Sequence, residues 1–162
     1  MRFEELIREH ATALFRYAYW LCRDRLQAED VVQEALLRGW RAFPRLREQA
    51  AAKAWLFSIV RNEHYRAMGR NPPLAENIDD LELADEHNAP RDLEIRQAIM
   101  SLPASYAEPL ALQVLGGFSC AEIAAMLGTS EGAVMTRLTR ARQALRRLVT
   151  GDSAKQRKGG RS

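Results

Sequence analysis

The chain has 162 residues, 47% of them hydrophobic and 7% aromatic, which suits one medium domain or two small domains. Its 24 basic and 21 acidic residues leave a net charge of only +3. No apolar run approaches ~18 residues and acidic residues crowd the N-terminus, so we expect a cytoplasmic protein without membrane insertion or a signal peptide.

The first part of the chain predicts three helices, over residues 3–21, 27–42 and 51–69. Apolar residues recur at helical spacing in each segment, and alternating β-branched and aromatic residues are scarce throughout the chain. Pro44 ends the second helix and Gly69 ends the third. Three helices of this length predict a compact bundle over residues 1–70.

Residues 71–90 differ in composition and predict a flexible acidic linker. Between Pro73 and Pro90 there are six carboxylates and no Lys or Arg. A second helical domain follows over residues 91–150, and residues 151–162 predict a disordered basic tail. The expected fold is therefore all-α, with two small helical domains. The four helices expected in the second domain cover residues 92–100, 106–115, 119–127 and 131–149.

The sharpest local motif is a helix-turn-helix in the second domain. Ser119 and Glu122 have the spacing of a capping box, which marks a helix start. Gly128 can adopt the left-handed turn conformation, and Ser130 can cap the next helix. The last helix carries an apolar inner stripe of Val134, Leu138, Ala141 and Leu145.

The outward face of this last helix is basic, as expected of a helix that contacts DNA. Arginine pairs with guanine or phosphate, and Thr suits a base edge or a phosphate. A solvated basic face on an ordinary helical hairpin would give the same pattern. The candidate duplex-DNA residues are Ser130, Thr136, Arg137, Thr139, Arg140, Arg142, Gln143 and Arg146.

The third helix has a face on which basic and aromatic residues alternate. Lys53, Phe57, Arg61 and Tyr65 recur every four residues, with Asn62 and Arg66 beside them. Single-stranded DNA binding requires charge for phosphates and flat rings for unstacked bases. The alternative is that Phe57 and Tyr65 only pack in the core or at its rim.

The second helix mixes charges with one apolar residue, Leu37, on the side away from its apolar stripe. Such a mixture suits a protein interface, although an ordinary solvated face is also consistent with it. The candidate partner-binding residues are Asp30, Gln33, Glu34, Leu37, Arg38 and Arg41.

The sequence contains no pattern for an enzyme, a metal site or a cofactor. His10, His64 and His87 are scattered, and we expect His64 to be a rim residue beside Tyr65. Cys22 and Cys120 lie among apolar residues, which predicts buried, inert thiols. Two further hypotheses stay open: a dimeric DNA-binding regulator, and a protein of the same fold that only binds a regulatory partner protein.

Taken together, these segments resemble the extracytoplasmic-function (ECF, group 4) sigma factors of the sigma-70 family, over about residues 3–149. The matching runs are residues 28–35 with Trp40, residues 54–62, and residues 102–103, 117–124, 132–138, 140–142 and 145–146. The resemblance implies a non-enzymatic subunit that directs RNA polymerase to promoters. The implied partners are core RNA polymerase (its largest-subunit coiled coil and its flap), promoter DNA and an anti-sigma protein. The free chain is expected to be a monomer.

The resemblance also assigns a role to each face. The second helix would hold the polymerase coiled coil, and the last helix would contact the −35 element. On the third helix, Asn62 would contact an extruded −10 base above Trp55, and the other candidates would line the melted strand. Met135, Thr139 and Pro109 depart from the commonest family pattern, which implies altered promoter preference and local geometry.

Overall fold

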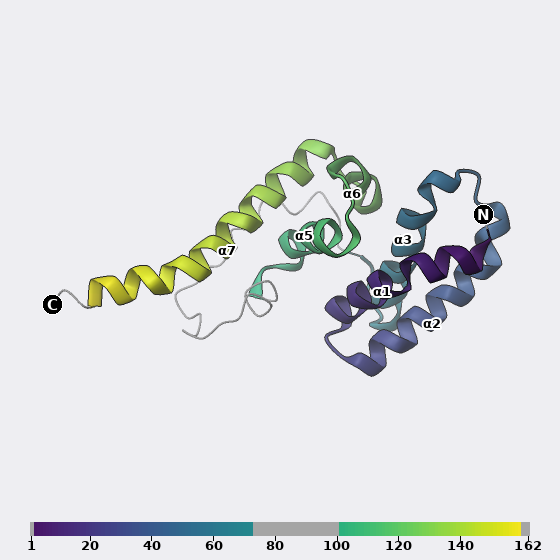
Figure 1. Ribbon diagram of the computed structural model, residues 1–162, viewed down its shortest axis with the longest axis horizontal. Helices are drawn as coiled ribbons and strands as arrows, with labels where there is room; N and C mark the ends of the chain where they lie inside the picture. Colours follow the sequence, from purple (N-terminus) through teal and green to yellow (C-terminus); the bar gives the residue numbers. More distant parts are fainter. Residues whose placement is uncertain (1, 73–100, 160–162) are drawn as a thin grey trace.

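The computed structural model describes residues 2–72 and 101–159, with side chains as far as Arg147, and each regular element in these ranges is helical. The predicted all-α fold is therefore confirmed. Figure 1 shows α1, α2 and α3 grouped together, with α5 and α6 beside them and α7 extending away. Most of the predicted linker and the predicted helix at residues 92–100 lie outside the described residues. The main helices are α1 (Phe3–Cys22), α2 (Arg25–Ala42), α3 (Ala52–Ala67), α5 (Ala104–Gly116), α6 (Cys120–Leu127) and α7 (Glu131–Gly159).

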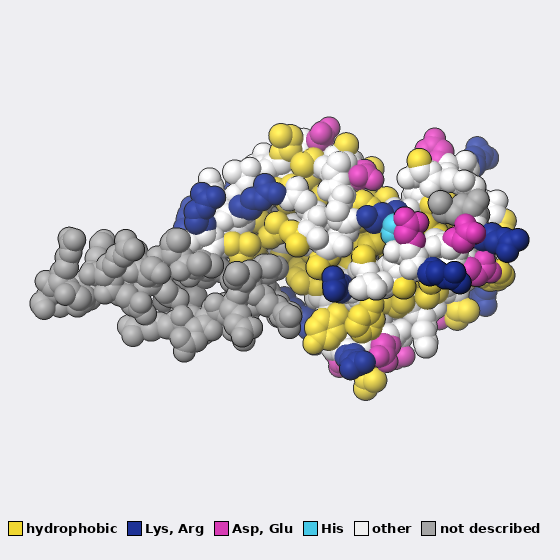
Figure 2. All heavy atoms as spheres, viewed as in Figure 1, with side chains coloured by type: hydrophobic (Ala, Val, Ile, Leu, Met, Phe, Trp, Pro, Cys, Tyr) yellow, Lys and Arg dark blue, Asp and Glu magenta, His cyan; other side chains and the backbone are white. Residues whose placement is uncertain are grey.

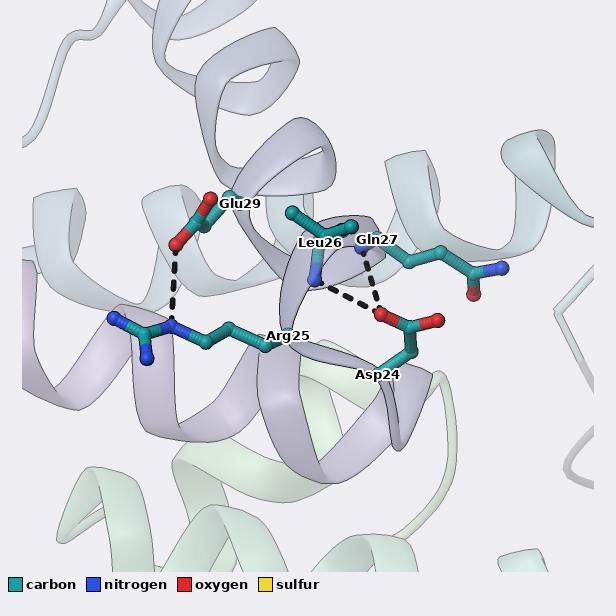
Figure 3. Close-up of polar contacts among 5 residues, drawn as sticks. All are labelled: Asp24, Arg25, Leu26, Gln27 and Glu29. Atoms are coloured by element: carbon teal, nitrogen blue, oxygen red, sulfur yellow. Dashed lines mark hydrogen bonds and ion pairs between the residues drawn. The ribbon is translucent and has the colours of Figure 1, made fainter.

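A two-residue turn joins α1 to α2. Arg23 ends α1 in the left-handed conformation, with φ of 58°. Asp24 then caps α2, because its Oδ1 accepts hydrogen bonds from the amides of Leu26 at 2.9 Å and Gln27 at 3.4 Å (Figure 3). This cap explains why α2 begins at Arg25, two residues before the start predicted from its apolar stripe.

A close approach at Gly39 brings the first three helices together. A Cβ atom at this position would lie 3.1 Å from the Phe3 ring and 3.4 Å from Leu56. Glycine therefore lets α1 and α3 pack directly against the α2 backbone. The core around this contact is apolar and fully enclosed; it includes Leu6, Leu14, Tyr17, Ala35, Leu56 and Val60.

The second domain packs α5 and α6 against α7. Pro109 lies inside α5 and does not end it, although its ring nitrogen cannot donate to the carbonyl of Ser105. At the other end of the domain, α7 continues to Gly159, so the tail predicted to be disordered from residue 151 is helical as far as that residue. The reason lies in composition: one Gly costs a helix only about 1 kcal/mol, and the residues that follow Gly151 include Ala154 and Lys155, both good helix formers.

Candidate nucleic-acid and polymerase interfaces

The helix-turn-helix is fixed at both of its helix starts. The Ser119 hydroxyl accepts from the Glu122 amide at 3.2 Å, and the Glu122 carboxylate accepts from the Ser119 amide at 3.0 Å. Gly128 ends α6 with φ of 70°, and the Ser130 hydroxyl accepts from the Ala133 amide at 3.1 Å. The predicted capping box and turn are confirmed, and together they set the angle at which α7 leaves the domain.

The outward face of α7 is exposed along most of its predicted length. Val134, Leu138 and Ala141 are buried on the opposite side, as their spacing predicts. Figure 2 shows Lys and Arg side chains on the surface of this part of the molecule. Arg142 also donates a hydrogen bond to Gln113 of α5, which restricts its position. The exposed candidates are Ser130, Thr136, Thr139, Arg140, Arg142, Gln143 and Arg146.

Two threonines on this face direct their hydroxyl protons back into the helix. Thr136 Oγ1 donates to the carbonyl of Gly132 at 3.0 Å, and Thr139 Oγ1 donates to that of Met135 at 2.9 Å. Each hydroxyl therefore keeps its acceptor lone pairs, and each side chain keeps its methyl group. Such a side chain can accept from a cytosine or adenine amino group or contact a thymine methyl group.

Arg137 does not belong to the exposed face. Its exposed fraction is 1%, so the prediction that it contacts duplex DNA is wrong for this structure. The reason is helical geometry: Arg137 lies three residues after Val134 and four before Ala141, on the same inner side. It is a buried cation of the domain.

The α2 candidates all lie on the surface. Asp30, Gln33, Glu34 and Arg41 are exposed, and Leu37 has an exposed fraction of 53%. Trp40 is 57% exposed, with its ring edge-on to Phe3 at a centroid distance of 5.9 Å. Two large apolar side chains among charges form a surface suited to a protein partner.

Arg38 connects this surface to α3 through Glu63. The Glu63 carboxylate is nearly buried and forms ion pairs with Arg38 of α2 and, at 3.2 Å, with Arg66 of α3. The Nε atom of Arg38 also lies 3.5 Å from Oε1 of Glu34, one turn earlier on α2. Sequence reasoning missed Glu63; the available signal was its spacing of three residues from Arg66 on one helix.

The predicted single-strand face of α3 is divided. Asn62 and Arg66 are exposed. We call Lys53, Phe57, Arg61 and Tyr65 the α3 stripe. Phe57 and Arg61 are buried, and Lys53 and Tyr65 are partly buried. The spacing correctly placed these four residues on one side, but that side faces the second domain.

Glu108 of α5 is the second buried charged residue that sequence reasoning missed. It forms a buried ion pair with Arg61, with side chains 4% and 8% exposed. Burial, together with the Glu108 carboxylate, raises the pKa of Tyr65 to about 12 and that of Tyr17 well above its usual value. The signal was present in the sequence, because Glu108 is the only charged residue between residues 104 and 121.

The thiols and histidines of the described residues show no ligand cluster. Cys22 Sγ lies 3.5 Å from His64 Nδ1, and burial raises the pKa of the Cys22 thiol. Cys22 and Cys120 are only partly buried, so the prediction of buried thiols is corrected. His64 is 7% exposed and its ring lies 4.9 Å from that of Tyr65, so it is more buried than the predicted rim position.

Two absences apply to the parts of the chain that the structure describes. In these parts, no three His, Cys, Asp or Glu side chains come together to hold a metal ion. No described helix combines the length and the apolar character that crossing a membrane requires.

The fold and its exposed basic helix define a two-domain helical protein with a helix-turn-helix. Family models match in the same order: Sigma-70 region 2 over residues 6–71 and a Sigma-70 region 4 model over residues 92–145. The chain belongs to the sigma-70 family of RNA polymerase sigma factors, and its relatives include ECF sigma factors. As a member of that family, it directs promoter-specific transcription initiation with core RNA polymerase.

Individual relatives agree with this assignment. The ECF sigma factor SigL of Mycobacterium tuberculosis is 40% identical over 147 residues, which cover 85% of this chain and 83% of SigL. The ECF sigma-E factor of Escherichia coli is 34% identical over 134 residues, which cover 72% of this chain and 70% of that sigma factor. Among solved structures, the sigma factor RpoE in complex with the anti-sigma factor NepR from Bartonella quintana has a TM-score of 0.72 and 28% identity. That match covers 91% of this chain and 96% of RpoE. CnrH in complex with the cytosolic domain of CnrY has a TM-score of 0.68 and 27% identity. That match covers 93% of this chain and 88% of CnrH.

Proposed function

We propose that this chain is a group 4 ECF sigma factor that uses three separate faces. The α2 face would bind the coiled coil of the polymerase's largest subunit, and α7 would bind the −35 duplex. Asn62, Arg66 and the α3 stripe would hold the non-template strand of the −10 element. The observation that carries the proposal is the exposed, doubly capped helix-turn-helix in a chain with family matches to both regions.

Residues 1–70 and 91–150 would act as separate recognition domains joined by the acidic linker. Each DNA contact alone would be weak and salt-sensitive, because it depends on a few phosphate contacts. Tethering both contacts to one polymerase raises their effective concentration on a promoter. We infer a cytoplasmic location, because the proposed partners, RNA polymerase and the chromosome, lie there.

Control by an anti-sigma protein is part of the proposal. Both solved neighbours are complexes, one with NepR and one with CnrY. The binding site on this chain would compete with polymerase or promoter DNA, which is the simplest way for a protein partner to hold a sigma factor inactive.

The α2 assignment is tested by measuring the affinity of the full chain for purified core polymerase. Leu37→Asp places a charge in the centre of the proposed interface, and we expect a loss of about tenfold or more. Val114→Asp is the matched control, because Val114 is an exposed apolar residue of the second domain, with a 66% exposed fraction. Equal losses for both variants, or no loss for Leu37→Asp, would contradict the assignment.

A further inference from the structure

The outward face of α7 changes in character along its length. Between residues 132 and 139 the one charged side chain is that of Arg137, which is only 1% exposed. The later turns carry exposed cations: Arg140, Arg142, Arg146 and Arg147. In helix-turn-helix proteins the N-terminal residues of the second helix contact base edges. The stretch of α7 that would meet the bases, residues 132–139, therefore presents an uncharged surface.

Met135 is the largest exposed side chain of this stretch, with an exposed fraction of 55%. Thr139 lies one turn later on the same side, and its hydroxyl donates to the Met135 carbonyl at 2.9 Å. Thr136, next to Met135, donates to the carbonyl of Gly132 at 3.0 Å. Because both hydroxyl protons are bound within the helix, the surface offers apolar groups and acceptor oxygens but no side-chain donor.

This surface matches one kind of base pair in the major groove. Guanine presents two acceptors there, which require a donor such as Arg, and the exposed side chains of residues 132–139 supply none. Adenine presents an amino donor beside the C5-methyl group of its partner thymine. A thymine–adenine pair therefore supplies both an apolar group for Met135 and a donor for a threonine oxygen.

We propose that Met135 determines base specificity at the −35 element by packing against the C5-methyl group of a thymine. The oxygens of Thr136 and Thr139 beside it accept from adenine amino groups. The exposed arginines further along α7 bind phosphates and supply affinity that does not depend on sequence. This inference rests on the proposed −35 role of α7, and it adds the chemical group that the helix recognises.

The test removes the methyl group from the DNA. The full chain is assembled with core polymerase and offered a promoter fragment, taken from upstream of a start that depends on the chain and randomised over its −35 region. The most enriched sequence is then synthesised with uracil in place of each −35 thymine in turn, on either strand, because uracil lacks only the C5-methyl group. Competition against the fluorescein-labelled thymine fragment gives the relative affinities.

We expect uracil at one or two −35 positions to weaken binding of the wild-type complex by roughly threefold to fivefold, the effect of burying one methyl group. Met135→Ala should bind the thymine and uracil fragments equally, whereas Met135→Leu should retain the difference. Met68→Ala is the matched control, because Met68 is 51% exposed in the first domain. This control should discriminate between the fragments as the wild type does.

The inference is overturned if the enriched −35 sequence contains no thymine–adenine pair. Equal binding of every uracil fragment by the wild type would overturn it as well. Discrimination that persists in Met135→Ala would show that another residue makes the methyl contact, which also contradicts the proposal.

Arg140→Ala separates this inference from the function on which it rests. If Arg140→Ala weakens binding to the enriched fragment but uracil has no effect, α7 binds the −35 duplex and the methyl contact is wrong. If neither Arg140→Ala nor Met135→Ala changes binding to that fragment, the −35 role of α7 is itself wrong.

Discussion

Replacing Glu63 tests the link between the polymerase-binding face and α3. Its nearly buried carboxylate, 7% exposed, forms ion pairs with Arg38 and Arg66, and Glu63→Gln removes the charge at almost constant shape. Removing one partner of a fully buried ion pair costs about 3–5 kcal/mol, because the other charge is left buried and unpaired. Arg38 and Arg66 are 42% and 57% exposed and can regain water, so we expect a net loss of about 1–2 kcal/mol in unfolding free energy.

Urea unfolding followed by circular dichroism measures this loss. With a slope of about 2 kcal/mol per molar urea, the midpoint should fall by roughly 0.5–1 M. Glu34→Gln is the matched control, because Glu34 contacts the same Arg38 but is 48% exposed, and its loss should stay below about 0.5 kcal/mol. If both variants lose equal stability, burial of Glu63 is not the reason for its contribution, and the argument fails.

Three further predictions follow from packing and charge. Gly39→Val should lower the unfolding free energy by about 2 kcal/mol or more, because its side chain would meet the Phe3 ring; a thermal melt that matches wild type would contradict this. Arg140→Ala should weaken −35 duplex binding and reduce the salt dependence of that binding, which fluorescence anisotropy measures. Arg137→Ala should mainly lower the melting temperature of the protein, because Arg137 is buried; a thermal melt measures this effect. Burial and the Arg61 guanidinium lower the pKa of His64, so stability is full above the unfolded pKa near 6.5 and falls as pH drops below it. His64→Gln should flatten that fall in urea titrations between pH 7 and 5, and an unchanged slope would refute the assignment.

Local patterns allowed much of the fold to be predicted. Helical spacing located the helices that the structure describes, and the capping box at Ser119 and the turn at Gly128 follow from side-chain chemistry within a few residues. The exposed Leu37 was predicted for the same reason, because its position relative to the α2 stripe depends only on helical geometry.

Long-range contacts were not predictable in the same way. The partner of Arg61 lies 47 residues away, and periodicity on α3 cannot show whether DNA or another domain covers that face. A lone carboxylate in an apolar helix, such as Glu108, needs a cationic partner when it is buried, but the sequence does not show which Lys or Arg provides it. The wrong prediction for Arg137 has a different cause. It was assigned to the DNA-binding face because it is an arginine, although helical spacing already placed it beside the buried residues Val134 and Ala141.

The most direct test of the account is transcription in vitro with core polymerase, genomic DNA and either the wild-type chain or Asn62→Ala, with transcript 5′ ends mapped. The account predicts that wild-type starts share −35 and −10 sequences, and that Asn62→Ala keeps the −35 sequence while losing selectivity at −10. Starts that do not depend on the added chain, or a −10 preference unchanged by Asn62→Ala, would contradict the central claim that α3 recognises the melted −10 strand.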